Sequence, residues 1–262
     1  MNSSGSGGGT FTGQVCLVTG AAGAIGSATA AAFADEGASL FLADAAAPDP
    51  QWAARLAERA PVAWRELDVA LSTDVAAVVL AAVERFGRID VLVNVAGVVS
   101  HGRAADLAEA EWDRVLAVNL KGTFLCCQAV IPVMRRQRYG RIVNLGSVVG
   151  QNGGNPRPWM DPSEQIRAGN VAYGVSKAGV HAMTAFLAKE LAADGITVNA
   201  IAPGPVATGM TATLPASLSA MIPVGRMGTP EEIAHSILHL ASPRSGFITG
   251  EVFDVNGGLT VG

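Results

Sequence analysis

The sequence has little of what marks a nucleic-acid-binding or membrane protein. Charged residues make up only 15% of its 262 residues, against a usual share of about 25%, and the net charge is −4. There is no basic stripe, so nucleic acid is not an expected partner. The apolar runs are short and interrupted by glycine or charge, so no membrane span is expected. The 50% hydrophobic share instead predicts a large buried core and some buried subunit surface.

Only three cysteines occur, and none has the spacing of a disulfide framework or a CxxC site. Cys16 lies in an apolar run, whereas Cys126 and Cys127 lie in a helical pattern. Reduced core thiols are expected, which favours a cytoplasmic location. The first residues, MNSSGSGGGT, lack the basic and apolar regions of a signal peptide. We expect residues 1–10 to form a flexible tail before a single domain over 11–262.

The sequence is rich in short apolar runs that alternate with longer helical patterns. Many of these patterns stop at glycine, as at Gly37, Gly87 and Gly195, which suits a left-handed C-cap. Such alternation is typical of a parallel sheet covered on both faces. We predict one doubly wound α/β domain of the Rossmann type, with ligands at the carboxyl ends of its strands. The seven strand-like runs are QVCLV, ASLFLA, VAWREL, IDVLVNV, RIVNL, ITVNAIA and EVFDVN.

A glycine-rich turn follows the first run, in VCLVTGAAGAIGSATAAAF. Gly20, Gly23 and Gly26 allow a sharp turn and a close backbone approach to a pyrophosphate at a helix N-terminus. Asp44 ends the second run, where a carboxylate accepts hydrogen bonds from the adenosine ribose and repels a 2′-phosphate. No basic residue stands at Gly23 or Ala45. The pattern favours NAD(H) over NADP(H), with a surface turn aspartate as the alternative.

A serine, a tyrosine and a lysine follow the later strands. Tyr173 and Lys177 are four residues apart in a helical pattern and so share one face. A nearby ammonium is expected to lower the pKa of the Tyr173 phenol from about 10 toward neutrality, which suits acid–base catalysis. Ser147, at the end of its strand, can offer a hydroxyl to a substrate oxygen. A YxxxK pair alone is common and is usually a surface feature.

Together these residues resemble the short-chain dehydrogenase/reductase family, in its compact single-domain NAD(P)-dependent type, over almost the whole chain. The chain departs from the family pattern at Ala24, where a glycine is usual, and at Val95, where a second asparagine is usual. All four catalytic positions are nevertheless filled. The matching segments are TGAAGAIG (19–26), DV (68–69), NVAG (94–97), VNLKG with Asn119, Ser147, YGVSK (173–177), PGPVAT (203–208) and DVNGG (254–258).

The resemblance implies a role for each matched residue. Tyr173 would exchange the alcohol proton, and Ser147 would hold the substrate oxygen. Lys177 would lower the pKa of Tyr173 and bind the nicotinamide ribose, with Asn119 maintaining a water-linked proton relay through Lys177. The further cofactor-binding residues implied are Gly20, Gly23, Ile25, Gly26 and Asp44 at the first two strands, Asp68 and Val69 at the adenine, Asn94, Ala96 and Gly97 after the fourth strand, and Pro203, Gly204, Val206 and Thr208, of which the last two would contact the nicotinamide carboxamide.

The activity implied is that of an NAD(H)-dependent oxidoreductase, without a metal, that interconverts a secondary alcohol and a ketone by hydride transfer. An NADH-dependent ketone or 3-oxoacyl reductase is the alternative. The further alternatives are an epimerase or dehydratase of the same fold and a non-catalytic NAD sensor. The resemblance also implies a homodimer or homotetramer, in which helices around 120–137 and 172–193 pair with those of other copies. The motifs name neither the substrate nor the physiological direction.

The segment GQNGGNPRPWMDPSEQIRAGN (150–170) makes the serine–tyrosine spacing about twice the usual family value, so it is an insertion beside the catalytic residues. Its pattern from Asp161 to Glu164 predicts a short helix over 162–168 that stops at Gly169. We expect it to influence substrate choice, with a lid that only packs on a neighbour as the alternative. Its predicted apolar anchors are Trp159, Met160 and Ile166, and its candidate partners for an anionic substrate group are Arg157 and Arg167.

A second segment, TGMTATLPASLSAMIPVGRMGTPEEIA, resembles the mobile substrate-binding region of the family. It ends in TPEE (229–232), which predicts a capping box at a helix start. His235 and His239 have a zinc-compatible spacing but lack the glutamate of HExxH, so a structural role is expected. His101 is expected to be an exposed loop residue at the border of the substrate pocket. The apolar residues of the segment that indicate a pocket lid, or interface packing, are Met210, Leu214, Leu218 and Met221.

Overall fold

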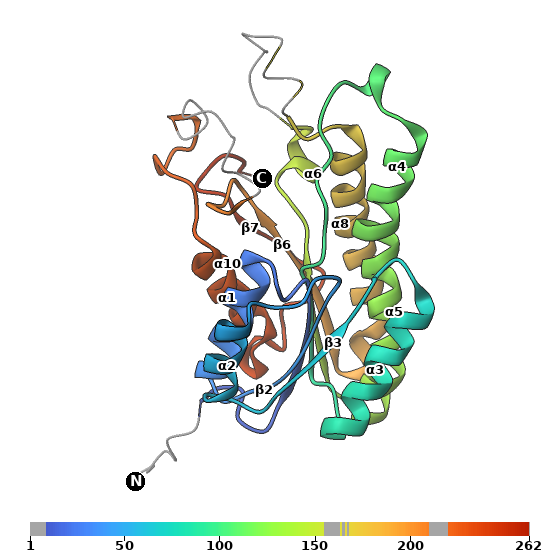
Figure 1. Cartoon of the computed structure of the whole chain (residues 1–262), viewed down its shortest axis with the longest axis vertical. Helices are drawn as coiled ribbons and strands as arrows, with labels where there is room; N and C mark the ends of the chain where they lie inside the picture. The colour runs from blue at the N-terminus through green and yellow to red at the C-terminus, as the bar shows by residue number, and fades with distance from the viewer. Residues whose placement is uncertain (1–8, 155–162, 164–165, 167, 210–219, 262) are drawn as a thin grey trace.

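A computed structural model describes residues 9–154, 163, 166, 168–209 and 220–261. Within these residues, seven parallel strands form one sheet in the order β3-β2-β1-β4-β5-β6-β7. Helices cover both of its faces (Figure 1), and every predicted run forms a strand, which confirms the doubly wound α/β fold. The strands are β1 (Val15–Thr19), β2 (Ser39–Asp44), β3 (Val62–Glu66), β4 (Val91–Asn94), β5 (Gly140–Leu145), β6 (Ile196–Pro203) and β7 (Val252–Val255).

The helices divide between the two faces of the sheet. α1, α2 and α10 lie on one face, and α3, α5 and α8 lie on the other (Figure 1). The α-helices are α1 (Ala24–Asp35), α2 (Pro50–Ala57), α3 (Ser72–Phe86), α4 (Glu109–Leu116), α5 (Thr123–Gln137), α6 (Val149–Asn152), α8 (Val171–Leu191) and α10 (Pro230–Ala241). The π-helical turn η2 (Ala117–Gly122) joins α4 to α5, and the short 3-10 helices are η1 (Ala104–Asp106), η3 (Ala192–Asp194) and η5 (Pro243–Ser245).

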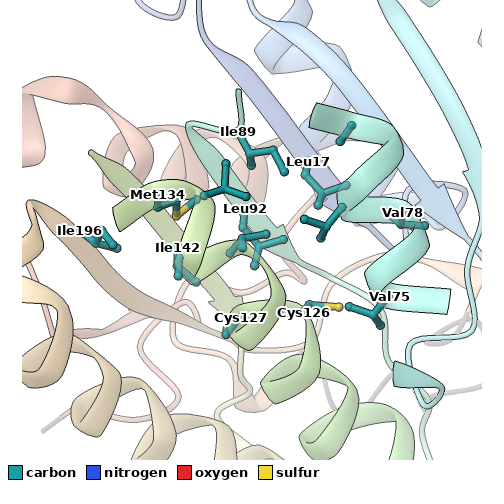
Figure 2. Close-up of a cluster of buried hydrophobic side chains, with 14 of the residues drawn as sticks. Leu17, Val75, Val78, Ile89, Leu92, Cys126, Cys127, Met134, Ile142 and Ile196 are labelled. Atoms are coloured by element: carbon teal, nitrogen blue, oxygen red, sulfur yellow. The ribbon is translucent and has the colours of Figure 1, made fainter. Parts of the chain in front are cut away.

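The strand side chains alternate between two hydrophobic clusters, one on each face. In β4, Leu92 faces the cluster that includes Cys126, Met134 and Ile142, as Figure 2 shows. Its neighbour Val91 faces the other cluster. Because both faces are buried, neither set of alternate positions has to be polar. This is the physical reason why the strands read as nearly continuous apolar runs.

The helix ends agree with the stop and start signals. Gly37, Gly87 and Gly195 all have left-handed φ angles, of 82°, 79° and 77°, as the glycine stops predict. At the start of α10, the Glu232 N–H donates to Thr229 Oγ1 at 3.3 Å and the Thr229 N–H donates to Glu232 Oε2 at 2.8 Å. The predicted capping box is therefore confirmed. Such a cap contributes about 1 kcal/mol.

The apolar spacing of residues 111–137 predicts one uninterrupted helix, but the π-helical turn η2 interrupts it between α4 and α5. The stretch Glu109–Gln137 is also long and apolar enough to pass a length-and-hydropathy test for a membrane span, which the sequence expectation had excluded. Core helices pass the same test. Here Cys126, Cys127 and Val130 are buried against the sheet, so we assign this stretch to the core.

Two predicted boundary regions are only partly described. At the N-terminal end, the Thr10 N–H donates to the Glu36 carboxylate at 2.7 Å, so the last residues of the expected 1–10 tail are attached to the domain. In the insertion, Ser163 and Ile166 are helical, and Ile166 is 58% exposed rather than buried as an anchor. Of the residues singled out in the insertion and in the second segment, those that lie outside the described ones are Arg157, Trp159, Met160, Asp161, Pro162, Glu164, Arg167, Met210, Leu214 and Leu218.

Candidate active site

A cavity of about 870 Å³ opens at the carboxyl ends of the strands. Its walls include the segments that follow β1, β2, β3, β4, β5 and β6 and the start of α8. It spans the place where β1 lies between β2 and β4, so that the connections leave the sheet in opposite directions. Such a switch point is where open parallel sheets bind ligands.

The glycine turn after β1 forms one wall, and its three glycines are not equivalent. Gly20 has φ +68°, and a Cβ on it would lie 2.5 Å from the Ala96 nitrogen. A Cβ on Gly26 would lie 2.0 Å from the Gly20 oxygen. A Cβ on Gly23 would lie 3.4 Å from that oxygen, which is an ordinary contact. Close backbone packing therefore requires glycine at Gly20 and Gly26, and leaves the α1 N-terminus facing the cavity, where an anion is favoured.

Asp44 lies at the end of β2 on the cavity wall, beside the glycine turn. Its Oδ2 accepts from the Ala22 N–H and its Oδ1 from the Ala46 N–H, both at 3.0 Å. Each carboxylate oxygen keeps a further acceptor site. Among the described wall residues the only lysine or arginine is Lys177, which follows Tyr173 on α8. The Asp44 end of the cavity thus suits hydroxyl donors and disfavours a phosphate.

Ser147, Tyr173 and Lys177 meet on the same cavity wall, although they come from the end of β5 and from α8. The Ser147 hydroxyl is hydrogen-bonded to the Tyr173 phenol. The Ser147 oxygen also accepts from the Val149 N–H at 3.2 Å, which fixes its rotamer. Lys177 Nζ lies 5.9 Å from the centroid of the Tyr173 ring and donates to the Leu145 carbonyl at 2.6 Å.

The electrostatics of this trio differ from the sequence expectation. Burial raises the pKa of Tyr173, and the hydrogen bond from Ser147 opposes that rise. Burial lowers the pKa of Lys177 to about 8. The expected lowering of the Tyr173 pKa by Lys177 is not seen, because the ammonium is itself desolvated and is directed at the Leu145 carbonyl.

Asn119 lies in η2 beneath this wall rather than on it. Its side chain holds Val98 at both backbone atoms, since Oδ1 accepts from the Val98 N–H at 2.8 Å and Nδ2 donates to the Val98 oxygen at 2.9 Å. Nδ2 also donates to Ser176 Oγ at 3.0 Å. A Cβ on Gly97 would lie 3.4 Å from Asn119 Oδ1 and 3.6 Å from Lys177 Nζ. Asn119 therefore fixes the loop after β4 against Lys177.

Most of the other predicted cofactor residues line the cavity, but Gly26 and Asn94 do not. The Asn94 side chain is buried and donates to Asn144 Oδ1 at 2.9 Å and to Cys127 Sγ at 3.4 Å. Strand alternation directs it into the core, so only the backbone that follows reaches the wall. The predicted residues on the wall are Gly20, Gly23, Ile25, Asp44, Asp68, Val69, Ala96, Gly97, Ser147, Tyr173, Lys177, Pro203, Gly204, Val206 and Thr208.

Many of the described wall residues are apolar, among them Val99, Val149, Met221 and Leu259. Met221 is the one residue of the predicted apolar lid that is described. His101 is exposed and also borders the cavity, in line with its sequence expectation.

Two residues next to the trio were not singled out from the sequence. The Ser147 N–H donates to Nε2 of His181 at 3.3 Å, and only a glycine at Gly146 leaves room for that ring, since a Cβ would lie 2.1 Å from Nε2. Burial and the charge of Lys177 lower the pKa of His181. The second residue is Asn170, the N-cap of α8. The sequence does hold a signal for each of them. His181 follows Lys177 by four residues and so shares its helix face, and Asn170 is an asparagine directly before a helical pattern.

Comparison with known proteins places the chain among reductases and dehydrogenases. The family model described as Enoyl-(Acyl carrier protein) reductase matches residues 20–260. The 3-oxoacyl-[acyl-carrier-protein] reductase FabG of Thermotoga maritima is 44% identical, covering 95% of this chain and 98% of its own. The (2S)-[(R)-hydroxy(phenyl)methyl]succinyl-CoA dehydrogenase subunit BbsD of Thauera aromatica is 40% identical, covering 95% and 97%. A solved chain described as a short-chain dehydrogenase/reductase from Burkholderia xenovorans is 36% identical, with a TM-score of 0.86 and coverage of 96% and 98%.

Proposed function

Because this chain belongs to the short-chain dehydrogenase/reductase family, we propose that it is an NAD(H)-dependent oxidoreductase that interconverts a secondary alcohol and a ketone. The observation that carries this proposal is the meeting of Ser147, Tyr173 and Lys177 in one cavity at the carboxyl ends of the strands. Bound NAD supplies the carrier that accepts or returns the hydride.

Ser147 and Tyr173 act on the substrate oxygen. In the oxidative direction Ser147 holds that oxygen, and the Tyr173 phenolate takes its proton as the carbinol hydrogen leaves with its electron pair. The products are a ketone and a neutral phenol, which returns its proton to solvent. The Ser147 hydroxyl favours the phenolate, because its hydrogen bond opposes the rise that burial causes in the pKa of Tyr173. In the reductive direction the same steps run in reverse, and the Tyr173 phenol donates its proton to the ketone oxygen.

The cofactor choice rests on Asp44. A 2′-phosphate at this end of the cavity would meet the carboxylate with no described cation on the wall beside it, and such like-charge contacts cost several kcal/mol. We therefore expect kcat/KM for NAD to exceed that for NADP by about 100-fold, or ~3 kcal/mol. Asp44→Ser should reduce this ratio mainly by improving the use of NADP. Equal use of both cofactors by the parent protein would contradict the assignment.

The direction of the reaction has two candidates. Reduction of a ketone or a 3-oxoacyl group is favoured by the names of two relatives, the 3-oxoacyl-[acyl-carrier-protein] reductases of Thermotoga maritima and Synechocystis. Oxidation is favoured by the preference for NAD and by the relative BbsD, which is named as a dehydrogenase. The chemistry at Tyr173 is the same in both.

A screen with NAD or NADH tests the proposed activity. Secondary alcohols with NAD and ketones with NADH, including aromatic and alicyclic compounds, should give stoichiometric change in reduced cofactor for at least one pair. Product without net change in the cofactor would indicate an epimerase or dehydratase. NAD binding without any turnover across the panel would indicate a sensor.

We place the enzyme in the cytoplasm as a homotetramer or homodimer. The support for the location is the set of three buried free cysteines. The support for association is the exposed apolar side chains on α5 and α8, namely Phe124, Val171, Val175 and Phe186.

A further inference from the structure

The end of the insertion is joined to the loop after β4 by a short backbone pairing. We call residues 100–102 and 168–170 together the clip. The clip lies at the entry to α8, three residues before Tyr173. Its contacts are the Asn170 N–H to the Ser100 oxygen (2.9 Å), the Gly102 N–H to the Ala168 oxygen (3.3 Å) and an antiparallel bridge between His101 and Gly169.

The Asn170 side chain, only 5% exposed, makes four hydrogen bonds in the clip. Its Oδ1 accepts from the N–H groups of Ala172 and Tyr173, at 3.1 and 3.4 Å. Its Nδ2 donates to Ser100 Oγ at 2.8 Å and to the His101 oxygen at 3.1 Å. The first pair caps α8 and the second pair binds the loop. Serine or aspartate can cap a helix, but only an amide also presents two donors.

The loop after β4 is thereby held at two points by asparagine side chains. Asn119 binds Val98 at its beginning, and Asn170 binds the loop two residues later. Gly97 in the same loop lies against Lys177 Nζ. The same loop therefore contacts both Lys177 and the start of α8, the helix that carries Tyr173.

We propose that Asn170 is a positioning residue for catalysis: it sets Tyr173 relative to the loop after β4. This inference rests on the proposed function, through the role of Tyr173. A cap alone would only stabilise α8. A positioning residue must in addition affect the chemical step, because small misplacement of a reacting group slows it.

Asn170→Ser is the test variant, because serine is an equally good cap but lacks the amide donors and adds no charge. Ser100→Ala removes one acceptor of the same amide. Asp49→Ala is the matched control, since Asp49 caps α2 through the Trp52 N–H at 2.7 Å and lies off the cavity wall. All variants are compared with the full-length parent.

Two readouts separate positioning from capping. The first is steady-state kinetics: Asn170→Ser should lower kcat by about tenfold and leave KM for NAD within about twofold. The second uses the fact that the chain has two tyrosines. With ¹³Cζ-labelled tyrosine, and Tyr139→Phe to assign the signals, NMR titration reports the Tyr173 pKa directly. Loosening Tyr173 relieves its burial, so its pKa should fall toward the ordinary value in both clip variants.

The outcomes are distinct. If Asn170→Ser leaves kcat and the Tyr173 signal unchanged, whatever its effect on the melting temperature, the positioning role is overturned. Asp49→Ala, which removes a cap away from the cavity, should lower the melting temperature and leave kcat unchanged. If the parent turns over no substrate, the proposed function fails, and the tyrosine signal still decides this inference: a shift in both clip variants supports it and no shift overturns it. If Asn170→Ser does not fold, Ser100→Ala decides by the same two readouts.

Discussion

At the scale of single residues, the site is governed by desolvation of its charged groups. Lys177 and His181 lie one turn apart on α8, and burial lowers the pKa of both. The two groups also oppose each other, since the charge of Lys177 lowers the His181 pKa further, while Asp254 on β7 raises it. Neutral His181 is the form whose Nε2 can accept the Ser147 N–H.

His181 should make the protein less stable in mild acid. Its folded pKa lies below its ordinary value of about 6.5, so the unfolded chain binds the proton first as the pH falls. Its contribution to stability is therefore complete above about pH 6.5 and is lost as the pH falls through the folded pKa. His181→Gln should flatten the pH dependence of the unfolding free energy between about pH 7 and 5.

Urea denaturation at a series of pH values measures this effect. His235→Gln is the control, because His235 is an exposed histidine on α10. An unchanged slope in His181→Gln, or the same change in both variants, would contradict the assignment.

At the scale of elements, the turn between β1 and α1 shows what the glycine pattern means physically. Glycine is needed at Gly20 for its left-handed φ and at Gly26 because of the Gly20 oxygen. Gly23 meets no close neighbour. The sequence alone does not show which of the three positions require glycine. The contacts that a Cβ would make at each position do show it.

Alanine substitutions should separate these glycines by stability. Gly26→Ala should destabilise the protein by about 1–3 kcal/mol or prevent folding, because its Cβ would overlap the Gly20 carbonyl. Gly23→Ala should change stability by less than about 0.5 kcal/mol. Thermal unfolding without ligand makes the comparison. Equal losses in the two variants would show that the turn relaxes around a Cβ.

The seven strands and the capping box were predictable from the sequence, because buried strands and helix starts have local signatures. The π-helical turn η2 was not, because the apolar spacing of 111–137 fits an uninterrupted helix. Asn94 was expected at the cofactor from its motif, but its side chain joins Asn144 on β5. The contacts of Asn170 and His181 also depend on segments far apart in the chain, which one sequence alone does not pair.

At the scale of the whole molecule, the chain has few charged residues and exposes apolar side chains on the surface of α5 and α8. Phe186 is 78% exposed and Phe124 is 41% exposed. Scattered apolar residues are normal on a monomer, but the exposed ones on α5 and α8 support the proposed subunit contact. The sequence resemblance implies association through the same helices.

Phe186→Glu should weaken that association. Sedimentation of the parent should give a multiple of the chain mass of 26.7 kDa, and the variant should shift toward smaller species. Leu80→Glu on α3, also exposed, should leave the distribution unchanged. A parent protein that sediments as a monomer at micromolar concentration would contradict the expected homo-oligomer.

The measurement that most directly tests the account follows the transferred hydrogen itself. A secondary alcohol found by the screen, deuterated at its carbinol carbon, is incubated with NAD and either the parent protein or Tyr173→Phe. We predict that the deuterium appears in the reduced cofactor, and that Tyr173→Phe slows this transfer by about 100- to 10,000-fold while still binding NAD. Deuterium that stays out of the cofactor, or transfer by Tyr173→Phe at the parent rate, would contradict it.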